Sequence, residues 1–188
     1  HNNMALALQD LGRMADAMAS YARAIAADPT YAKAHYNLGN ALRAAGRLEA
    51  AADSYGRALA ANPNYALAHN NLGLAQQEMG QIEAAMDSFR QAIAQNGDYA
   101  VARANLGALS DDAGNIEEME RLIGEPDVAT GDAIQLYFAL GGAYGKQGGD
   151  DRAFAQIVKG NRLKRSTLHY DAAAARDHFQ QKIETFDN

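Results

Sequence analysis

The chain has 188 residues, 48% of them hydrophobic, with 17 basic and 23 acidic side chains and a net charge of −6. This balance argues against a general nucleic-acid binder, which needs clustered Lys and Arg. No apolar run reaches the roughly 18 residues of a membrane span, so we expect no membrane partner. The absence of cysteine excludes disulfide and thiolate chemistry. It fits a reducing compartment, and we expect a cytoplasmic protein.

A 34-residue repeat organises the sequence. Residues 34–63 recur at 68–97 with no gap, so that Gly39 falls onto Gly73. A fixed period of this length indicates an array of helical hairpins. Gly39 and Gly73 each follow a core leucine, where a missing side chain lets the second helix come close. Gly46 is expected to end the first helix in a left-handed conformation.

The same frame extends on both sides of these two repeats. The first repeat lacks its opening turn, so we expect further repeats upstream. The second half of the fourth repeat is degenerate, which predicts a short, atypical helix there. The C-terminal stretch predicts a helix that caps the last hairpin. We predict a single array over residues 1–188, with repeats at 1–31, 32–65, 66–99, 100–133 and 134–167 and a capping helix at 168–188.

These residues resemble the tetratricopeptide repeat (TPR) family. The resemblance implies an all-α, right-handed superhelix of stacked antiparallel helix hairpins, in which the first helices line a concave surface. It also implies a protein- or peptide-binding scaffold without catalysis. The repeats at 34–107 are similar to those of the O-linked N-acetylglucosamine transferase array. Residues 120–187 resemble the junction before the sulfotransferase domain of bacterial TPR fusions. The alternative function is therefore the non-catalytic, substrate-recruiting region of a larger transferase, whose catalytic domain would be a downstream partner.

Asparagines recur at one phase of the period, and each lies about 100° around its helix from the following core residue. An amide can pair with a peptide backbone whatever the peptide's side chains. The resemblance to the transferase array implies this role, with protein or extended peptide as the partner. Alternatively, the amides form hydrogen bonds between helices or are simply solvated. The predicted peptide-binding residues are Asn3, Asn37, Asn71, Asn105, Tyr36, Asn40 and Asn70.

Other candidate chemistry is weak, and we predict no catalytic residue, no cofactor and no metal. His35 and His69 occupy equivalent positions of stacked hairpins, too far apart to share a zinc ion. Adjacent carboxylates such as Glu117 and Glu118 do not face each other on a helix. The basic cluster at 159–165 either complements a helix dipole or docks a following domain or an acidic partner. Self-association through the first hairpin and an RNA-reading array remain alternatives.

Overall fold

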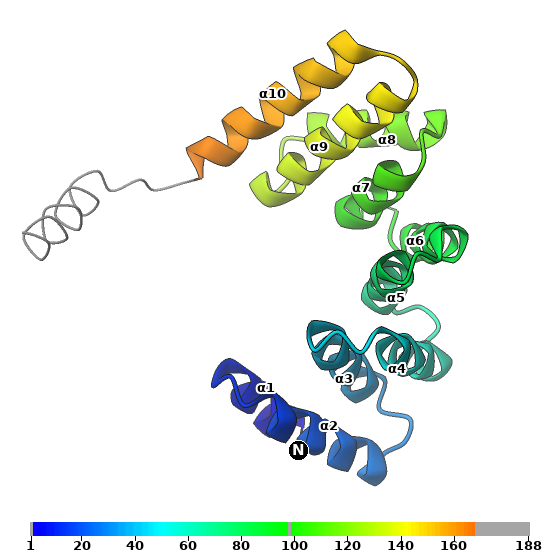
Figure 1. Cartoon of the computed structure of the whole chain (residues 1–188), viewed down its shortest axis with the longest axis vertical. Helices are drawn as coiled ribbons and strands as arrows, with labels where there is room; N and C mark the ends of the chain where they lie inside the picture. The colour runs from blue at the N-terminus through cyan, green and yellow to red at the C-terminus, as the bar shows by residue number, and fades with distance from the viewer. Residues whose placement is uncertain (1, 98, 168–188) are drawn as a thin grey trace, which may run out of the picture.

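The computed structural model describes residues 2–97 and 99–167, which form ten α-helices and no strand. The helices pair into antiparallel hairpins, and the hairpins stack into a curved array (Figure 1). This confirms the prediction of an all-α solenoid. The helices are α1 Asn2–Asp10, α2 Met14–Ala27, α3 Ala32–Ala44, α4 Leu48–Ala61, α5 Ala66–Glu78, α6 Ile82–Gln95, α7 Ala100–Leu109, α8 Ala113–Gly124, α9 Thr130–Lys146 and α10 Asp150–Ser166.

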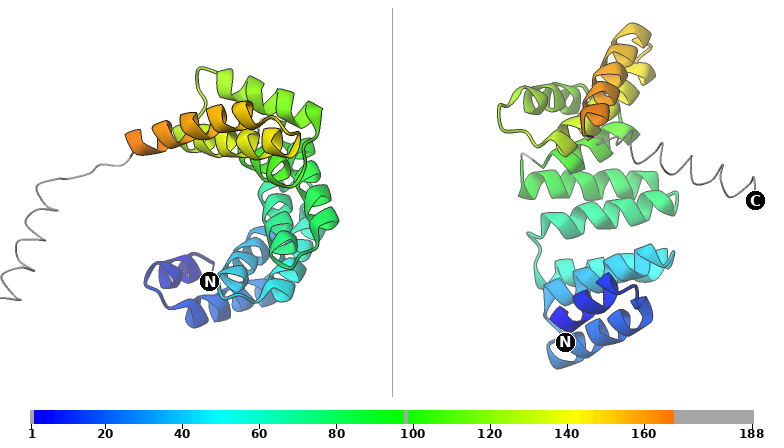
Figure 2. Two further views of the ribbon diagram at one scale, coloured as in Figure 1. Left: turned by 45° about the horizontal axis from the view of Figure 1, so that its top comes forward. Right: turned by 90° about the vertical axis from the view of Figure 1, so that its left-hand side faces the viewer.

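The array curves into a C shape, which is plainest in the left view of Figure 2. Helices α3 and α5 lie on the inner side of the curve, and α4 and α6 lie on the outer side (Figure 1). The division into repeats remains a prediction. The expected capping helix at 168–188 lies outside the described residues.

Four of the five hairpin turns in the described residues are closed by a glycine in the left-handed conformation, and the α7–α8 turn is the exception. Gly46 has φ 71°, and its N–H donates to the Arg43 carbonyl at 2.9 Å. The next N–H, of Arg47, reaches back to the Leu42 carbonyl at 2.9 Å. This pair of bonds is a Schellman motif, which ends α3 and lets α4 begin at once. Gly80 has φ 76° and closes the α5–α6 turn with the same two bonds.

The two helices of each central hairpin are held together by a ring placed over a glycine. A Cβ added at Gly39 would lie 2.6 Å from Cε1 of Tyr55, and one added at Gly73 would lie 2.6 Å from Cε1 of Phe89. Both rings are fully buried. A real Cβ could not fit at those distances, so the glycines are required for the close approach of α3 to α4 and of α5 to α6.

The degenerate repeat solves the same packing problem differently. Helix α8 has 12 residues, two fewer than α4 and α6, and the carboxylate of Asp112 caps its start by accepting from the Asn115 N–H at 2.9 Å. Met119 fills the space over Gly107 that rings fill in the earlier hairpins. Helix α9 then packs directly on α7, where Lys146 Nζ donates to the Ala108 carbonyl at 2.7 Å.

The close approach at Gly73 gives a stability prediction. Gly73→Ala should cost about 1–3 kcal/mol, because the new methyl overpacks against the Phe89 ring. The matched control is Gly56→Ala on α4, where an added Cβ meets nothing within 4 Å. It should stabilise the protein by about 0.5–1 kcal/mol through helix propensity alone. Urea denaturation would measure both, and equal effects of the two changes would contradict the packing role of Gly73.

Candidate functional site

Polar side chains link the inner helices α3 and α5. Asn71 Nδ2 donates to Asn40 Oδ1 at 2.8 Å and to the Tyr36 hydroxyl oxygen at 3.2 Å. Asn40 Oδ1 also accepts from the Tyr55 hydroxyl at 2.8 Å. The ring that packs over Gly39 is therefore tied to the inner face by its hydroxyl, and burial raises the pKa of Tyr55 to about 12.

The chain of bonds continues to α7. Asn70 Nδ2 donates to Asn71 Oδ1 at 3.1 Å, and Asn105 Nδ2 donates to Asn70 Oδ1 at 2.9 Å. We call the five residues joined in this way the amide network: Tyr36, Asn40, Asn70, Asn71 and Asn105. On the other side of α3, Asn37 Nδ2 donates to Asn2 Oδ1 on α1 at 3.0 Å.

Six of the seven predicted site residues thus form side-chain hydrogen bonds between or along the inner helices. This arrangement corresponds to the alternative interpretation, in which the amides bond between helices. Asn37 and Asn70 are 8% and 2% exposed, so as placed they offer little to a ligand. Asn40, Asn71 and Asn105 are half-buried, and Asn3 is exposed on α1. Within the described residues, Asn40 Nδ2 and Asn105 Oδ1 have no hydrogen-bond partner. They leave one donor and one acceptor available on this face.

Charged groups on this face pair with each other across repeats. Arg43 Nε lies 3.1 Å from Glu78 Oε1, which joins the C-terminal ends of α3 and α5. The pair is partly exposed and contributes at most about 1 kcal/mol. It also occupies the arginine, so this part of the inner face offers no free cationic clamp for a carboxylate.

The sequence analysis did not include the tyrosines that precede the inner helices among the site residues. Tyr31, Tyr65 and Tyr99 stand 34 residues apart, immediately before α3, α5 and α7, a period that the sequence already displays. The Tyr65 ring centroid lies 4.9 Å from that of Tyr36. Burial raises the pKa of Tyr99 to about 12, and the nearby phenol of Tyr36 and carboxylate of Asp132 add to the shift.

The two histidines have a structural role. Nε2 of His35 lies 2.9 Å from the Pro29 carbonyl, and Nε2 of His69 lies 2.9 Å from the Pro63 carbonyl. Arg103, at the same phase, donates from Nε to the Gly97 carbonyl at 3.0 Å. These bonds fix each inner helix to the loop before it. Over residues 2–97 and 99–167, no three His, Asp or Glu side chains gather as metal ligands would.

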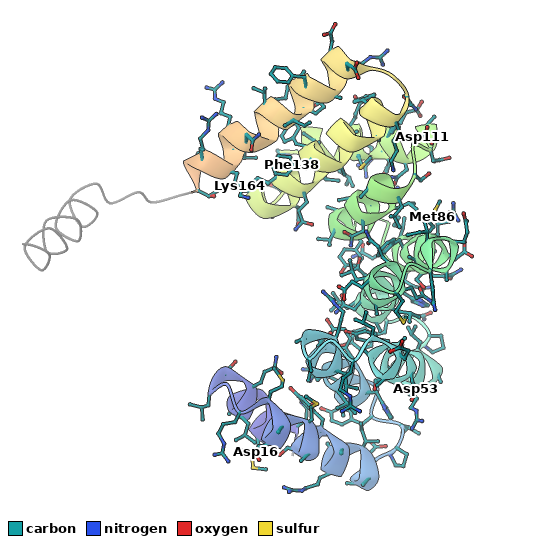
Figure 3. All side chains as sticks on the ribbon, in the orientation of Figure 1. Asp16, Asp53, Met86, Asp111, Phe138 and Lys164 are labelled. Carbon is teal, nitrogen blue, oxygen red and sulfur yellow. The ribbon has the colours of Figure 1, made fainter. Side chains whose placement is uncertain are left out.

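A separate hollow opens on the outer side, between α2 and α4. This outer groove has a volume of about 500 Å³. Leu38 and Leu42 of α3 contribute to its lining, together with Ala22 of α2 and Asp53 of α4. Asp53 is labelled on α4 in Figure 3. The sequence analysis did not anticipate it, because small alanines facing each other across two hairpins carry no local signal.

Sequence profiles of known repeat families match the first half of the chain. The profile described as TPR repeat matches residues 5–43 and 39–80, and the tetratricopeptide repeat profile matches residues 66–99. Together they span residues 5–99, half of the 188-residue chain. The chain is a tetratricopeptide repeat protein. No curated protein sequence matches this TPR protein.

Solved structures agree with this assignment. The crystal structure of MamA is similar with a TM-score of 0.70 and 27% identity, over 87% of this chain and 95% of that one. YrrB, described as a TPR protein with an unusual peptide-binding site, has a TM-score of 0.67 and 19% identity. That match covers 88% of this chain and 86% of YrrB. MamA from Desulfovibrio magneticus RS-1 has a TM-score of 0.65 and 20% identity, and the match covers 88% of this chain and 93% of that one. None of the described helices is long and apolar enough to cross a membrane.

The amide network predicts unequal effects for two asparagines at the same phase of the repeat. Asn71→Ala should destabilise the fold by about 1–3 kcal/mol, because it removes three hydrogen bonds and leaves partly buried groups without partners. Asn3→Ala, at an exposed position on α1, should change stability by less than about 0.5 kcal/mol. Urea denaturation of the two variants tests this, and a harmless Asn71→Ala would show that the network adds nothing to stability.

The raised pKa of Tyr99 predicts a loss of stability in alkali. The folded-state pKa, about 12, lies above the ordinary value of 10.0, so folding favours the neutral phenol. Its contribution is complete below pH 10 and is lost as the pH rises from about 10 to about 12. Tyr99→Phe cannot ionise there and should lose less stability over that range. Denaturation at pH 9 and pH 11 would show the difference, and identical losses would contradict it.

Proposed function

We propose that the chain is a non-catalytic scaffold that binds an extended peptide along the inner face of α3, α5 and α7. The observation that carries the proposal is the pattern of hydrogen bonds in the amide network. Its members bond to one another, while Asn40 Nδ2 and Asn105 Oδ1 keep a free donor and a free acceptor. Those are the two kinds of group that a peptide backbone requires.

The network also favours binding on energetic grounds. Side chains that are already held by neighbours lose little conformational entropy when a ligand arrives. Asn71 holds Asn40, and Asn70 holds Asn105, so the two free groups are fixed before the peptide binds. In this proposal the buried Asn70 is a positioning residue, while the predicted site residue Asn37 ties α3 to α1 through Asn2. Asn3, Tyr36 and Asn71 complete the predicted site. YrrB provides a precedent, as a TPR protein with a peptide-binding site.

A second candidate function is the substrate-recruiting region of a transferase, such as a sulfotransferase or one similar to the O-linked N-acetylglucosamine transferase. Its support in the structure is the end of α10, where Lys164 and Arg165 are exposed in the last turn and form no ion pair within the described residues. A basic surface there suits docking to a following domain. The complete open reading frame decides this candidate, because the proposal requires a catalytic domain encoded downstream.

Self-association is a further candidate interaction of the first hairpin. Met4 and Leu11 of this hairpin are 47% and 73% exposed, which leaves apolar surface unprotected from water. Sedimentation at increasing concentration would detect it. A Leu11→Ser variant should then shift the equilibrium toward monomer.

The proposed function predicts where selected peptides bind. Twelve-residue peptides would be selected from a random phage-displayed library against the whole chain, then synthesised and titrated by fluorescence anisotropy. Asn105→Ala should weaken their binding by about 0.5–1.5 kcal/mol for the neutral hydrogen bond lost. The control is Ala22→Arg, which fills the outer groove and should leave binding unchanged. The reverse pattern, with Ala22→Arg harmful and Asn105→Ala harmless, would move the site to the outer groove.

A further inference from the structure

Four tyrosines gather at the N-terminal ends of the inner helices. Tyr31, Tyr65 and Tyr99 are the residues that precede α3, α5 and α7, and Tyr36 lies in the second turn of α3. We call these four residues the tyrosine strip. They come from three successive hairpins and border the same inner face as the amide network, because Tyr36 belongs to both.

Two rings of the strip, from successive hairpins, lie close together. Tyr36 and Tyr65 have ring centroids 4.9 Å apart with planes at 41°. Burial raises the pKa of Tyr65, and the phenols of Tyr36 and Tyr31 add to the shift. Tyr31 is 37% exposed, and the other three are half-buried. The strip therefore presents partly open aromatic surface and not a closed core.

The hydroxyl groups of the strip are donors without an acceptor. Tyr36 Oη accepts from Asn71 Nδ2, which leaves its own proton free. Within the described residues, none of the four hydroxyls donates a hydrogen bond. Where it crosses the tyrosine strip, the best partner has flat apolar groups and carbonyl acceptors, and it needs no backbone N–H groups there. Proline-rich segments have this chemistry, because proline lacks the N–H.

The spacing of the strip suits a polyproline II helix. One turn of that helix contains three residues and rises about 9 Å. Helices in direct contact lie about 8–10 Å apart. Side-chain hydrogen bonds join α3 to α5 through Asn40 and Asn71, and α5 to α7 through Asn70 and Asn105, so we expect a spacing of this order between the inner helices. We therefore expect equivalent tyrosines on successive inner helices to recur at a spacing comparable with one turn of a polyproline II helix.

We propose that the tyrosine strip binds a proline-rich segment in the polyproline II conformation, laid across the starts of α3, α5 and α7. The tyrosine rings pack on the proline rings, and the free tyrosine hydroxyls donate to the carbonyls of the ligand. This inference rests on the proposed function, because it names the class of peptide that the inner face takes.

The test uses two fluorescein-labelled 12-residue peptides, one of proline and one of alternating glycine and serine, titrated against the whole chain by anisotropy. The proline peptide should bind at least about tenfold more tightly. Tyr65→Ala should weaken its binding about tenfold, as expected for a central aromatic contact. Tyr36→Phe keeps the ring and loses the donor, so it should have a smaller effect. The control Phe154→Ala, at an exposed aromatic residue of α10, should bind like the parent.

Circular dichroism melting of each variant separates a lost contact from a lost fold. Should Tyr65→Ala lower the melting temperature, Tyr31→Ala tests the same surface at the most exposed member of the strip. Equal affinity for the two peptides, or unchanged proline binding by Tyr31→Ala, would overturn the inference. If library-selected peptides bind in an Asn105-dependent way while the proline peptide does not, the inference fails and the proposed function stands. If no peptide binds, both fail.

Discussion

The close contact between a bulky side chain and a glycine is the constraint on which the rest of the array depends. Tyr55 over Gly39 and Phe89 over Gly73 set the separation of the two helices in a hairpin. A helix of 13 or 14 residues is marginal in water by itself, so this packing is what makes each hairpin stable. Because the contact recurs every 34 residues, the inner faces of successive hairpins come into register.

The amide network depends on that register. The hydroxyl of Tyr55 donates to Asn40 while its ring packs over Gly39, so one side chain serves both the hairpin core and the inner face. The hydrogen bonds from Asn71 to Asn40 and from Asn105 to Asn70 then tie each hairpin to the next. Stability in a repeat array is the sum of such intrinsic and neighbour terms. In this array, part of the interaction between neighbouring hairpins comes from directional hydrogen bonds between polar side chains.

The hairpins could be predicted from sequence because their signals are local. Gly46 ends α3 as expected, and Gly80 ends α5 in the same way, since a positive φ is costly for any other residue. The asparagines could be identified from their 34-residue spacing, but the sequence left open whether they face a ligand or bond to one another. Whether Asn71 faces a ligand or Asn40 depends on the distance between α3 and α5, which no single repeat encodes. The role of Met119 over Gly107 was hidden because the expected aromatic residue is absent and the sequence alone names no substitute.

The asymmetry between the two faces of the array has a mechanical consequence. On the inner face, short hydrogen bonds resist any separation of neighbouring hairpins: Asn37 donates to Asn2 between α3 and α1, and Asn71 donates to Asn40 between α5 and α3. On the outer side, the groove between α2 and α4 is a hollow of about 500 Å³ lined partly by alanines, which leaves room for a change in width. Bending should therefore occur about the inner edge as a hinge line, with the outer groove opening or closing. The curvature of the superhelix can then change while the spacing of the inner binding groups stays constant.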